Sequence, residues 1–193
     1  MKSIQFPMSR KDVRKLRVGD EVAVFGTMVT GRDAAHKLMV EQKPEFIRPY
    51  LENGALYHCG PVMKQTRGVW QAAAAGPTTS IREEPYEATV IEEYGVRAVI
   101  GKGGMGKKTS GALRKFGAVY LHAVGGAAVS AADAIVSVET VFLLEELGVP
   151  EAFWVFKTEG LKAVVTMDAH GGSLHAEVLA ASRGARDRLS AIS

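Results

Sequence analysis

The sequence predicts a layered α/β domain, and two features of its pattern carry this prediction. Up to about residue 75, short β-rich runs separated by turns are typical of antiparallel strands. After about residue 96, β-rich runs alternate with helical patterns, which indicates βαβ units with parallel strands. We therefore expect a single domain over residues 1–193, in which a mixed or antiparallel sheet is stacked on a parallel sheet with helices outside.

The first part of the chain contains two helical patterns and several short strands. Ser9 is a candidate N-cap, and Gly31 ends a β-rich run just before a helical pattern with an apolar inner face. Turn signals at 60–61 and 66–68 separate the later runs. The expected elements are helices over 10–16 and 32–42 and strands over 21–29, 54–59, 62–64 and 69–75.

The second part alternates between helices and strands and ends in an expected hairpin. Gly95 and Gly117 are the stops of two of its helices. The expected helices cover 85–94, 107–116 and 127–132, and the expected strands cover 96–100, 118–124 and 135–143, followed by a turn at 145–150. In the hairpin, 153–157 and 161–167 face 173–178 across a turn at 168–172. Residues 183–193 are expected to form a polar, frayed tail.

Charge and hydropathy exclude several classes of protein. The 24 basic and 21 acidic residues give a net charge of +3, and no basic run with interleaved aromatic residues indicates a nucleic-acid partner. Neither a signal peptide nor an apolar run long enough to cross a membrane is present, so we expect a cytoplasmic protein.

The cysteine and histidine content argues against a metal centre held by this chain. Cys59 is the only cysteine, which excludes an intrachain disulfide and a cysteine-ligated cluster. His170 and His175 flank a Gly-Gly pair without a carboxylate at a usual ligand spacing, and we interpret them as turn or strand residues. We expect no metal ligands in this chain, so a metal would have to be held by another protein.

Three glycine-punctuated loops, at 30–33, 76–82 and 101–106, each carry one cation. Such loops present backbone N–H groups to an anion, and the cations are Arg32, Arg82 and Lys102. Arginine pairs with a carboxylate at two points, whereas lysine supplies a point charge. The three loops together predict a site for a small dicarboxylate or a phosphate. For any one loop alone, a tight turn with a solvated cation explains the pattern as well.

The loop at 101–107 also matches parts of two nucleotide-binding motifs. Its glycine spacing is that of a dinucleotide fingerprint, but no acidic residue follows at the end of the next strand. It also matches most of a P-loop, except that Lys108 stands where a Ser or Thr is required. A nucleotide-binding protein that uses the Gly101–Lys107 loop is therefore an alternative of another class, and a simple βα turn is a third interpretation.

Five motifs follow one another along the chain: TGRDAAHK at 30–37, YHCGP at 57–61, GPTTSIR at 76–82, GKGGM at 101–105 and GG at 125–126. Together they resemble one enzyme family, the β subunits of iron-sulfur hydro-lyases. These are the class I fumarate hydratases and L-tartrate dehydratases, in which the same region is the C-terminal domain when the enzyme is one chain. Glu83 departs from the family pattern, which usually has Met after the arginine, and the departure concerns a packing contact more than the chemistry.

The resemblance implies a swivelling β/β/α three-layer fold and a two-subunit enzyme. In such an enzyme a separate α subunit carries a [4Fe-4S] cluster, whose open iron acts as a Lewis acid on the substrate. The implied reaction is the reversible hydration of fumarate to L-malate, with dehydration of L-tartrate as the alternative. A methyl-substituted fumarate and a non-catalytic interaction module also remain open, and a heterodimer or a heterotetramer of two α and two β subunits is implied.

The resemblance also implies roles for individual residues. Arg32, Arg82 and Lys102 match positions that hold the substrate carboxylates, together with Gly101 and Thr79. Thr78 matches the position of a base for the carbon-bound proton. Since a threonine hydroxyl is a poor base at neutral pH, Arg32 and an acidic residue of the α subunit would assist it. Asp33 is implied as a supporting residue behind the site, and His58 is interpreted as a satisfied strand histidine.

Overall fold

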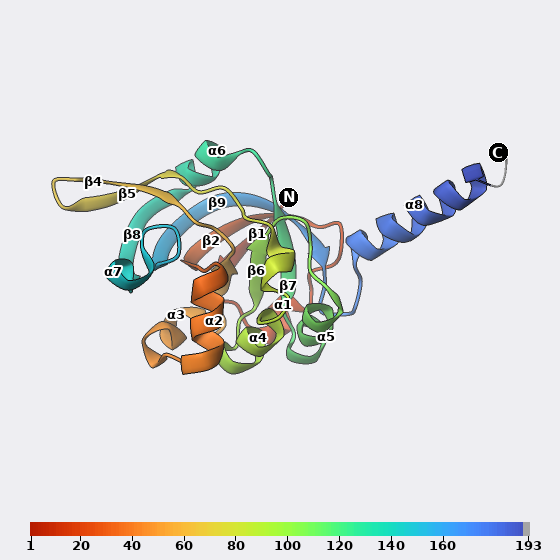
Figure 1. Cartoon of the computed structure of the whole chain (residues 1–193), viewed down its shortest axis with the longest axis horizontal. Helices are drawn as coiled ribbons and strands as arrows, with labels where there is room; N and C mark the ends of the chain where they lie inside the picture. The colour runs from red at the N-terminus through yellow and green to blue at the C-terminus, as the bar shows by residue number, and fades with distance from the viewer. Residues whose placement is uncertain (191–193) are drawn as a thin grey trace.

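A seven-stranded mixed sheet forms the centre of the computed structural model, which describes residues 1–190 (Figure 1). The strands lie in the order β1-β2-β3-β6-β7-β9-β8, and an additional pairing of β2 with β9 closes a ring of β2, β3, β6, β7 and β9. The strand bounds are β1 (Lys2–Phe6), β2 (Glu21–Thr30), β3 (Ala55–Tyr57), β6 (Ala98–Gly101), β7 (Val119–Ala123), β8 (Ile135–Phe142) and β9 (Phe153–Met167). A separate antiparallel pair consists of β4 (Val62–Thr66) and β5 (Val69–Ala74).

The strands β1, β2, β3, β6 and β7 pair in parallel, whereas β9 runs antiparallel to β2, β7 and β8. The register places Thr30 of β2 beside Tyr57 of β3, and Tyr57 beside Ile100 of β6. The carboxyl ends of three neighbouring strands therefore lie level at one edge of the sheet. In sheets with parallel strands this edge is where ligands bind.

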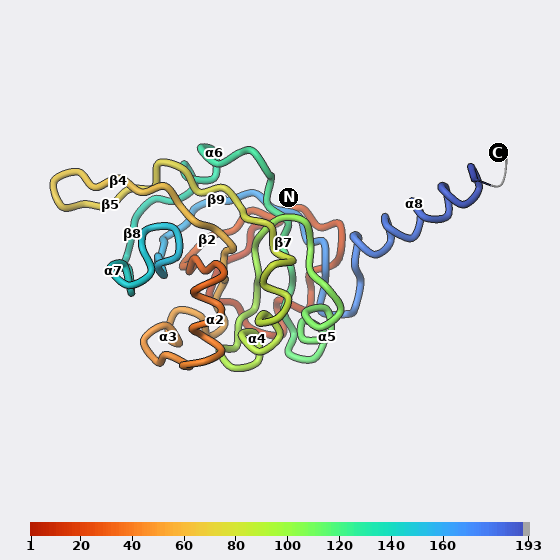
Figure 2. Tube along the Cα trace, in the orientation of Figure 1, coloured from red at the N-terminus to blue at the C-terminus, as the bar shows by residue number. Residues whose placement is uncertain are grey.

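Helices cover the sheet and extend from it. In Figure 1, α2, α3, α4 and α5 lie on one side of the sheet, and Figure 2 shows the β4–β5 arm and α8 extending in opposite directions. The helix bounds are α1 (Arg10–Val13), α2 (Asp33–Gln42), η1 (Glu45–Ile47), α3 (Arg48–Leu51), η2 (Ser80–Glu83), α4 (Glu87–Tyr94), α5 (Lys107–Phe116), α6 (Ala128–Asp133), α7 (Leu144–Leu147) and α8 (Leu174–Ser190). Within residues 1–190 we find no helix with both the length and the apolar character needed to cross a membrane.

Both faces of the sheet are buried, because successive strand residues point to opposite sides. Tyr57 belongs to the apolar cluster enclosed by the strands, whereas its neighbour Leu56 packs with the helices α2, α3 and α4. The same alternation places Leu121 inside and Tyr120 on the helix side. The loops at the edge of the sheet therefore start from strands that are packed on both faces.

The structure confirms the mixed α/β class and the presence of a separate antiparallel sheet. The expectation of antiparallel strands throughout the first part is wrong, because β1, β2 and β3 pair with one another in parallel and, among the strands before residue 75, only β4 and β5 form an antiparallel pair. Residues 45–51 fold as η1 and α3 and, with α2, provide the long crossover that a parallel β2–β3 pair requires. The swivelling three-layer arrangement stays a prediction.

The expected closing hairpin is wrong in its second arm. β9 runs without a break from Phe153 to Met167, with Gly160 at a φ of 79° inside it. The turn at 168–172 is present, but it leads into helix α8 rather than a strand, in keeping with the Ala, Leu and Arg content of that segment. His170 lies in the turn, whereas His175 lies in the helix. Residues 183–190, expected as a tail, continue α8, and 191–193 lie outside the described residues.

Candidate functional site

Three loops meet at the level edge of β2, β3 and β6. The segment 78–80 lies between the ends of β3 and β6, because the Thr78 N–H donates to the His58 carbonyl (2.7 Å) and the Lys102 N–H donates to the Thr78 carbonyl (3.2 Å). The Ser80 N–H donates in turn to the Lys102 carbonyl (2.9 Å). The backbone of the second loop is therefore fixed between the other strand ends, as a short extension of the sheet.

The two arginines share one carboxylate. Arg82, whose side chain is 53% exposed, donates a hydrogen bond from Nη2 to Oδ2 of Asp33, and Arg32 Nη2 lies 3.8 Å from the same oxygen. Arg32 Nε lies 3.4 Å from Oε1 of Glu151. Asp33 thus holds the two guanidinium groups near one another, where a ligand carboxylate could pair with both.

Gly60 and Glu151 fix the Arg32 side chain. A Cβ at Gly60 would lie 2.6 Å from Arg32 Nη1, so the glycine of the YHCGP motif leaves the space that the guanidinium fills. The Glu151 carboxylate also accepts the Ala34 N–H (3.0 Å) at the N-terminus of α2. The same anion therefore stabilises the helix start and the arginine that precedes it.

Lys102 and the threonines lie on the same edge. Thr79 forms a parallel bridge with Lys102 and is exposed. Within residues 1–190 the Lys102 ammonium makes no ion pair. The Thr78 hydroxyl donates to the His58 carbonyl (3.0 Å), and Thr79, although at the N-cap of η2, makes no capping bond through its side chain. Neither threonine hydroxyl therefore caps a helix, and the chain enters a 3-10 helix at Ser80.

Gly101 is required because buried polar side chains lie directly behind the loop. A Cβ at this position would lie 1.9 Å from the Ser80 Oγ and 3.2 Å from both the His58 Nδ1 and the Tyr120 Oη. These three polar groups are buried and bonded to one another. The glycine therefore leaves room for a polar cluster directly beneath the Lys102 loop.

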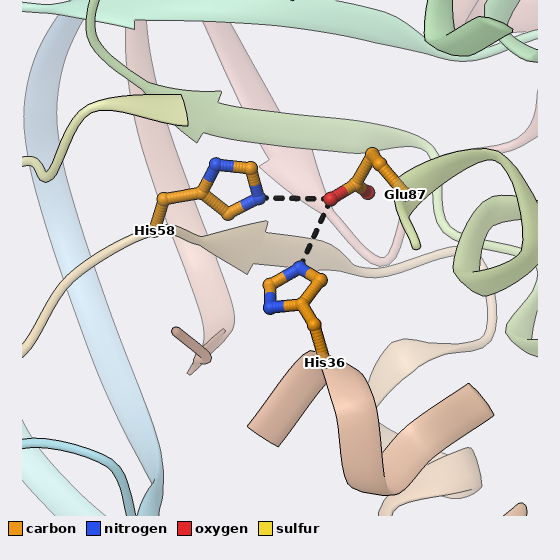
Figure 3. Close-up of side chains that lie close together, drawn as sticks. All are labelled: His36, His58 and Glu87. Carbon is orange, nitrogen blue, oxygen red and sulfur yellow. Dashed lines mark hydrogen bonds and ion pairs between the residues drawn. The ribbon is translucent and has the colours of Figure 1, made fainter. Parts of the chain in front are cut away.

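Two histidines and a glutamate form the middle of this cluster (Figure 3). His36, His58 and Glu87 are fully buried, and Glu87 Oε2 lies 3.0 Å from His36 Nε2 and 2.9 Å from His58 Nε2. Burial would raise the pKa of Glu87, but the hydrogen bonds from both histidines lower it to about 2. Burial opposes the charged form of His36, yet its bond to Glu87 raises its pKa, whereas burial lowers the pKa of His58. These shifts favour an ionised Glu87, a protonated His36 and a neutral His58.

The residues of this cluster could in principle hold a metal ion, since the two Nε2 atoms and the carboxylate lie within 4.8 Å of one another. The observed contacts favour hydrogen bonds, because both nitrogens lie at hydrogen-bond distance from the same oxygen. The second ring nitrogens are also bonded, His36 Nδ1 to the Arg32 carbonyl (2.8 Å) and His58 Nδ1 to Ser80 Oγ (2.9 Å). Both ring nitrogens of His58 are thus hydrogen-bonded, as expected. The residue lies just after β3 rather than in a strand, and its partners are the buried side chains of Glu87 and Ser80.

Glu83, the residue that departs from the family pattern, lies beside the same cluster. It is 1% exposed, its Oε2 has no hydrogen-bond partner among the described residues, and that oxygen lies 3.7 Å from His36 Nδ1. Burial raises the pKa of Glu83 from 4.5 to about 7. The folded protein therefore favours the protonated acid, and the stability it contributes is full below about pH 4.5 and is lost as the pH rises through about 7.

We therefore expect Glu83→Gln to be more stable than the wild type at pH 8 and about equal to it at pH 4.5, because the amide mimics the protonated acid. Thermal unfolding of both proteins from pH 4.5 to 8 measures the difference. A melting-temperature difference that does not change with pH would contradict the raised pKa.

The start of α5, where a phosphate would bind in a nucleotide-binding loop, is occupied by a side chain of this chain. The Glu84 carboxylate accepts the N–H groups of Gly106 (2.7 Å), Lys108 (2.9 Å) and Thr109 (3.3 Å) and the Thr109 hydroxyl (2.7 Å). A carboxylate at a helix N-terminus is stabilised by the same donors that bind phosphate. This arrangement argues against the nucleotide alternative.

Glu84→Ala is expected to lower the free energy of unfolding by about 2 kcal/mol, since four donors lose a charged acceptor. The melting temperature should fall by about 4–8 °C in a chain of this size. The matched control is Glu92→Ala, which removes a half-exposed glutamate paired with Lys115 and should change little. Equal melting temperatures for both variants would contradict the capping role of Glu84.

Residues missed by sequence reasoning are mainly the buried ones. His36 and His58 lie in motifs that were singled out, but Glu87 and Tyr120 were not assigned a role. A signal was present for Glu87, because it shares the apolar face of α4 with Val90, Ile91 and Tyr94, all of which are buried. An ionisable residue on such a face needs a buried partner.

Comparison with known proteins identifies sequences that are similar to this chain. The family described as "Fumarase C-terminus" matches residues 2–178. A protein of Geobacillus stearothermophilus named "Putative fumarate hydratase class I" is 51% identical over 178 residues, which cover 91% of this chain and 34% of that protein. The L(+)-tartrate dehydratase subunit beta of Escherichia coli is 39% identical over 178 residues, covering 91% of this chain and 87% of that subunit. The chain therefore spans about a third of the fumarate hydratase relative and most of the tartrate dehydratase subunit.

Proposed function

Because this chain belongs to the Fumarase C-terminus family, whose members here are named as hydro-lyases, we propose that it is the β subunit of a two-subunit, [4Fe-4S]-dependent fumarate hydratase. The observation that carries the proposal is the meeting of Arg32, Arg82 and Lys102 at one edge of the sheet. The reaction is the reversible hydration of fumarate to L-malate. We take residues 1–193 as one domain of a cytoplasmic complex.

In this proposal the chain binds and orients the substrate. Arg32 and Arg82, linked through Asp33, pair with one carboxylate, and Lys102 supplies a point charge for the other. Thr79 and the Gly101 backbone lie beside Lys102 and complete the contacts. Holding a dicarboxylate at fixed points lowers the entropic part of the barrier to reaction.

Thr78 is the proposed base for the carbon-bound proton. Its hydroxyl donates to the His58 carbonyl, which cannot take up the proton, so the deprotonated form needs help from other groups. Arg32 would stabilise the alkoxide, and an acidic residue of the α subunit would accept the proton.

The single cysteine of the sequence does not fit as a ligand of the [4Fe-4S] cluster. Cys59, the only cysteine, is 1% exposed, and burial raises the pKa of its thiol to about 12. A thiolate is the form that ligates iron, so Cys59 does not fit a cluster ligand. We assign the cluster to the α subunit, a partner that the name "subunit beta" of the tartrate dehydratase relative supports.

L-tartrate dehydration is the second candidate, since this chain is 39% identical over 178 residues to a protein named L(+)-tartrate dehydratase subunit beta. The test is anaerobic co-expression with a candidate α subunit, followed by the absorbance of fumarate on addition of L-malate and by oxaloacetate formation from L-tartrate. Activity on malate in the complex, but not in the isolated chain, supports the proposal. Activity on tartrate alone would replace it with the second candidate, and failure of the chains to associate would overturn both.

A further inference from the structure

A buried chain of hydrogen bonds runs behind all three substrate loops. Its six contacts join the carbonyl of Arg32, in the first loop, to the amide of Gly104, in the third, and it passes through Ser80 in the second. We call it the buried chain. Its members, in order, are the Arg32 carbonyl, His36, Glu87, His58, Ser80, Tyr120 and the Gly104 N–H, and the contacts between them are 2.8, 3.0, 2.9, 2.9, 2.8 and 3.3 Å.

The backbone groups fix the direction of the hydrogen bonds at the two ends of the buried chain, and the ionised carboxylate of Glu87, which can only accept, fixes the two bonds in its middle. At one end the Gly104 amide can only donate, so the Tyr120 oxygen accepts there and its O–H donates to Ser80. The Ser80 hydroxyl then donates to His58 Nδ1, which leaves the proton of His58 on Nε2, where it is donated to Glu87. His58 is therefore the neutral Nε2–H tautomer.

At the other end the Arg32 carbonyl can only accept, so His36 Nδ1 carries a proton. His36 Nε2 faces the Glu87 carboxylate and carries a proton as well, which makes His36 an imidazolium. The groups that face it are Glu87 from α4, Glu83 from η2 and the neutral His58 after β3. Within residues 1–190 these neighbours include two acidic groups and no second cation, in keeping with a positive charge on His36.

We infer that this buried chain sets the spacing of the three loops, and that His36, Glu87, His58 and Tyr120 are positioning residues for the dicarboxylate site. The inference rests on the proposed function for the identity of the ligand. Each loop is hydrogen-bonded to the buried chain at one point. Each of the three cations, Arg32, Arg82 and Lys102, lies within two residues of such a point. A change in any one contact shifts one cation relative to the others, and small displacements of binding groups cost much of the rate.

Tyr120→Phe tests the positioning role with the least disturbance, because it removes one hydroxyl and keeps the ring. In the complex with the α subunit we expect kcat/KM for L-malate to fall about ten- to a hundredfold. The matched control is Tyr94→Phe, which removes a hydroxyl from an equally buried tyrosine that donates to the Met39 carbonyl, outside the buried chain. Its kinetics should match the wild type. Equal kinetics for Tyr120→Phe in an active complex would overturn the inference, whereas an inactive wild-type complex would overturn the proposed function.

Nitrogen NMR of the full chain, labelled at its histidines, shows which ring nitrogens carry protons and does not depend on an activity assay. At pH 7 we expect His36 with both ring nitrogens protonated and His58 as the Nε2–H tautomer. Glu87→Gln should convert His36 to a neutral ring, because it removes the buried negative charge that stabilises the imidazolium. A neutral His36 in the wild type, or a metal ion bound in equal amount to the chain, would overturn the proton order.

Discussion

Arg82→Ala is expected to lower kcat by about two to three orders of magnitude and to raise KM for the dicarboxylate in the complex with the α subunit. The guanidinium is half exposed and is held only by Asp33 among the described residues, so it can pair with a ligand without leaving its place. The same exposure means that its removal leaves the core intact. The loss should therefore appear in the kinetics and not in the melting temperature.

Arg82→Lys separates charge from geometry at this position. Lysine restores a cation but lacks the planar fork, so we expect it to recover part of KM and little of kcat. Arg186→Ala is the matched control, because Arg186 is an exposed arginine on α8, paired with its neighbour Asp187. The measurement is kcat and KM of the three variants and the wild type, each in the complex with the α subunit. Unchanged kinetics for Arg82→Ala would remove Arg82 from the site.

The parts of the fold that local signals determine could be predicted from the sequence. Helix α5 has the bounds that were expected, and Gly95 and Gly117 end their helices in the left-handed conformation that glycine favours. Arg32 and Lys102 were found for the same reason, because each directly follows a glycine at the end of a strand. The roles of Arg32, Arg82 and Lys102 in binding stay predictions.

The parts that depend on distant contacts could not be predicted. The pairing of β2 with β9 joins segments more than a hundred residues apart, as in the register of Val22 with Ala163. Short β-rich runs do not reveal whether their partners are parallel or antiparallel, and this explains the error before residue 75. The buried chain has the same origin, since His36, His58 and Glu87 come from three different segments and show no ligand spacing in the sequence.

Gly101→Ala should combine a loss of stability with a loss of activity. The added Cβ would lie 1.9 Å from the Ser80 Oγ, so the serine has to rotate and give up its bonds to His58 and Tyr120. Overpacking and two lost buried hydrogen bonds should lower the free energy of unfolding by about 3 kcal/mol. The melting temperature should fall by about 6–12 °C.

Gly111→Ala is the matched control for this change. Gly111 lies in α5, and a Cβ there would have no other atom within 4 Å. Because alanine is the better helix former, this variant should be more stable by about 1 kcal/mol.

The double variant Gly101→Ala, Ser80→Ala tests the cause of the loss. Removing the Ser80 hydroxyl removes the collision, so the double variant should unfold at a higher temperature than the sum of the two single changes predicts. Its activity should stay low, since the buried chain is still broken at Ser80. Additive losses of stability would show that the new Cβ collides with a group other than the Ser80 hydroxyl. Full activity in the double variant would show that the loops keep their spacing without the buried chain.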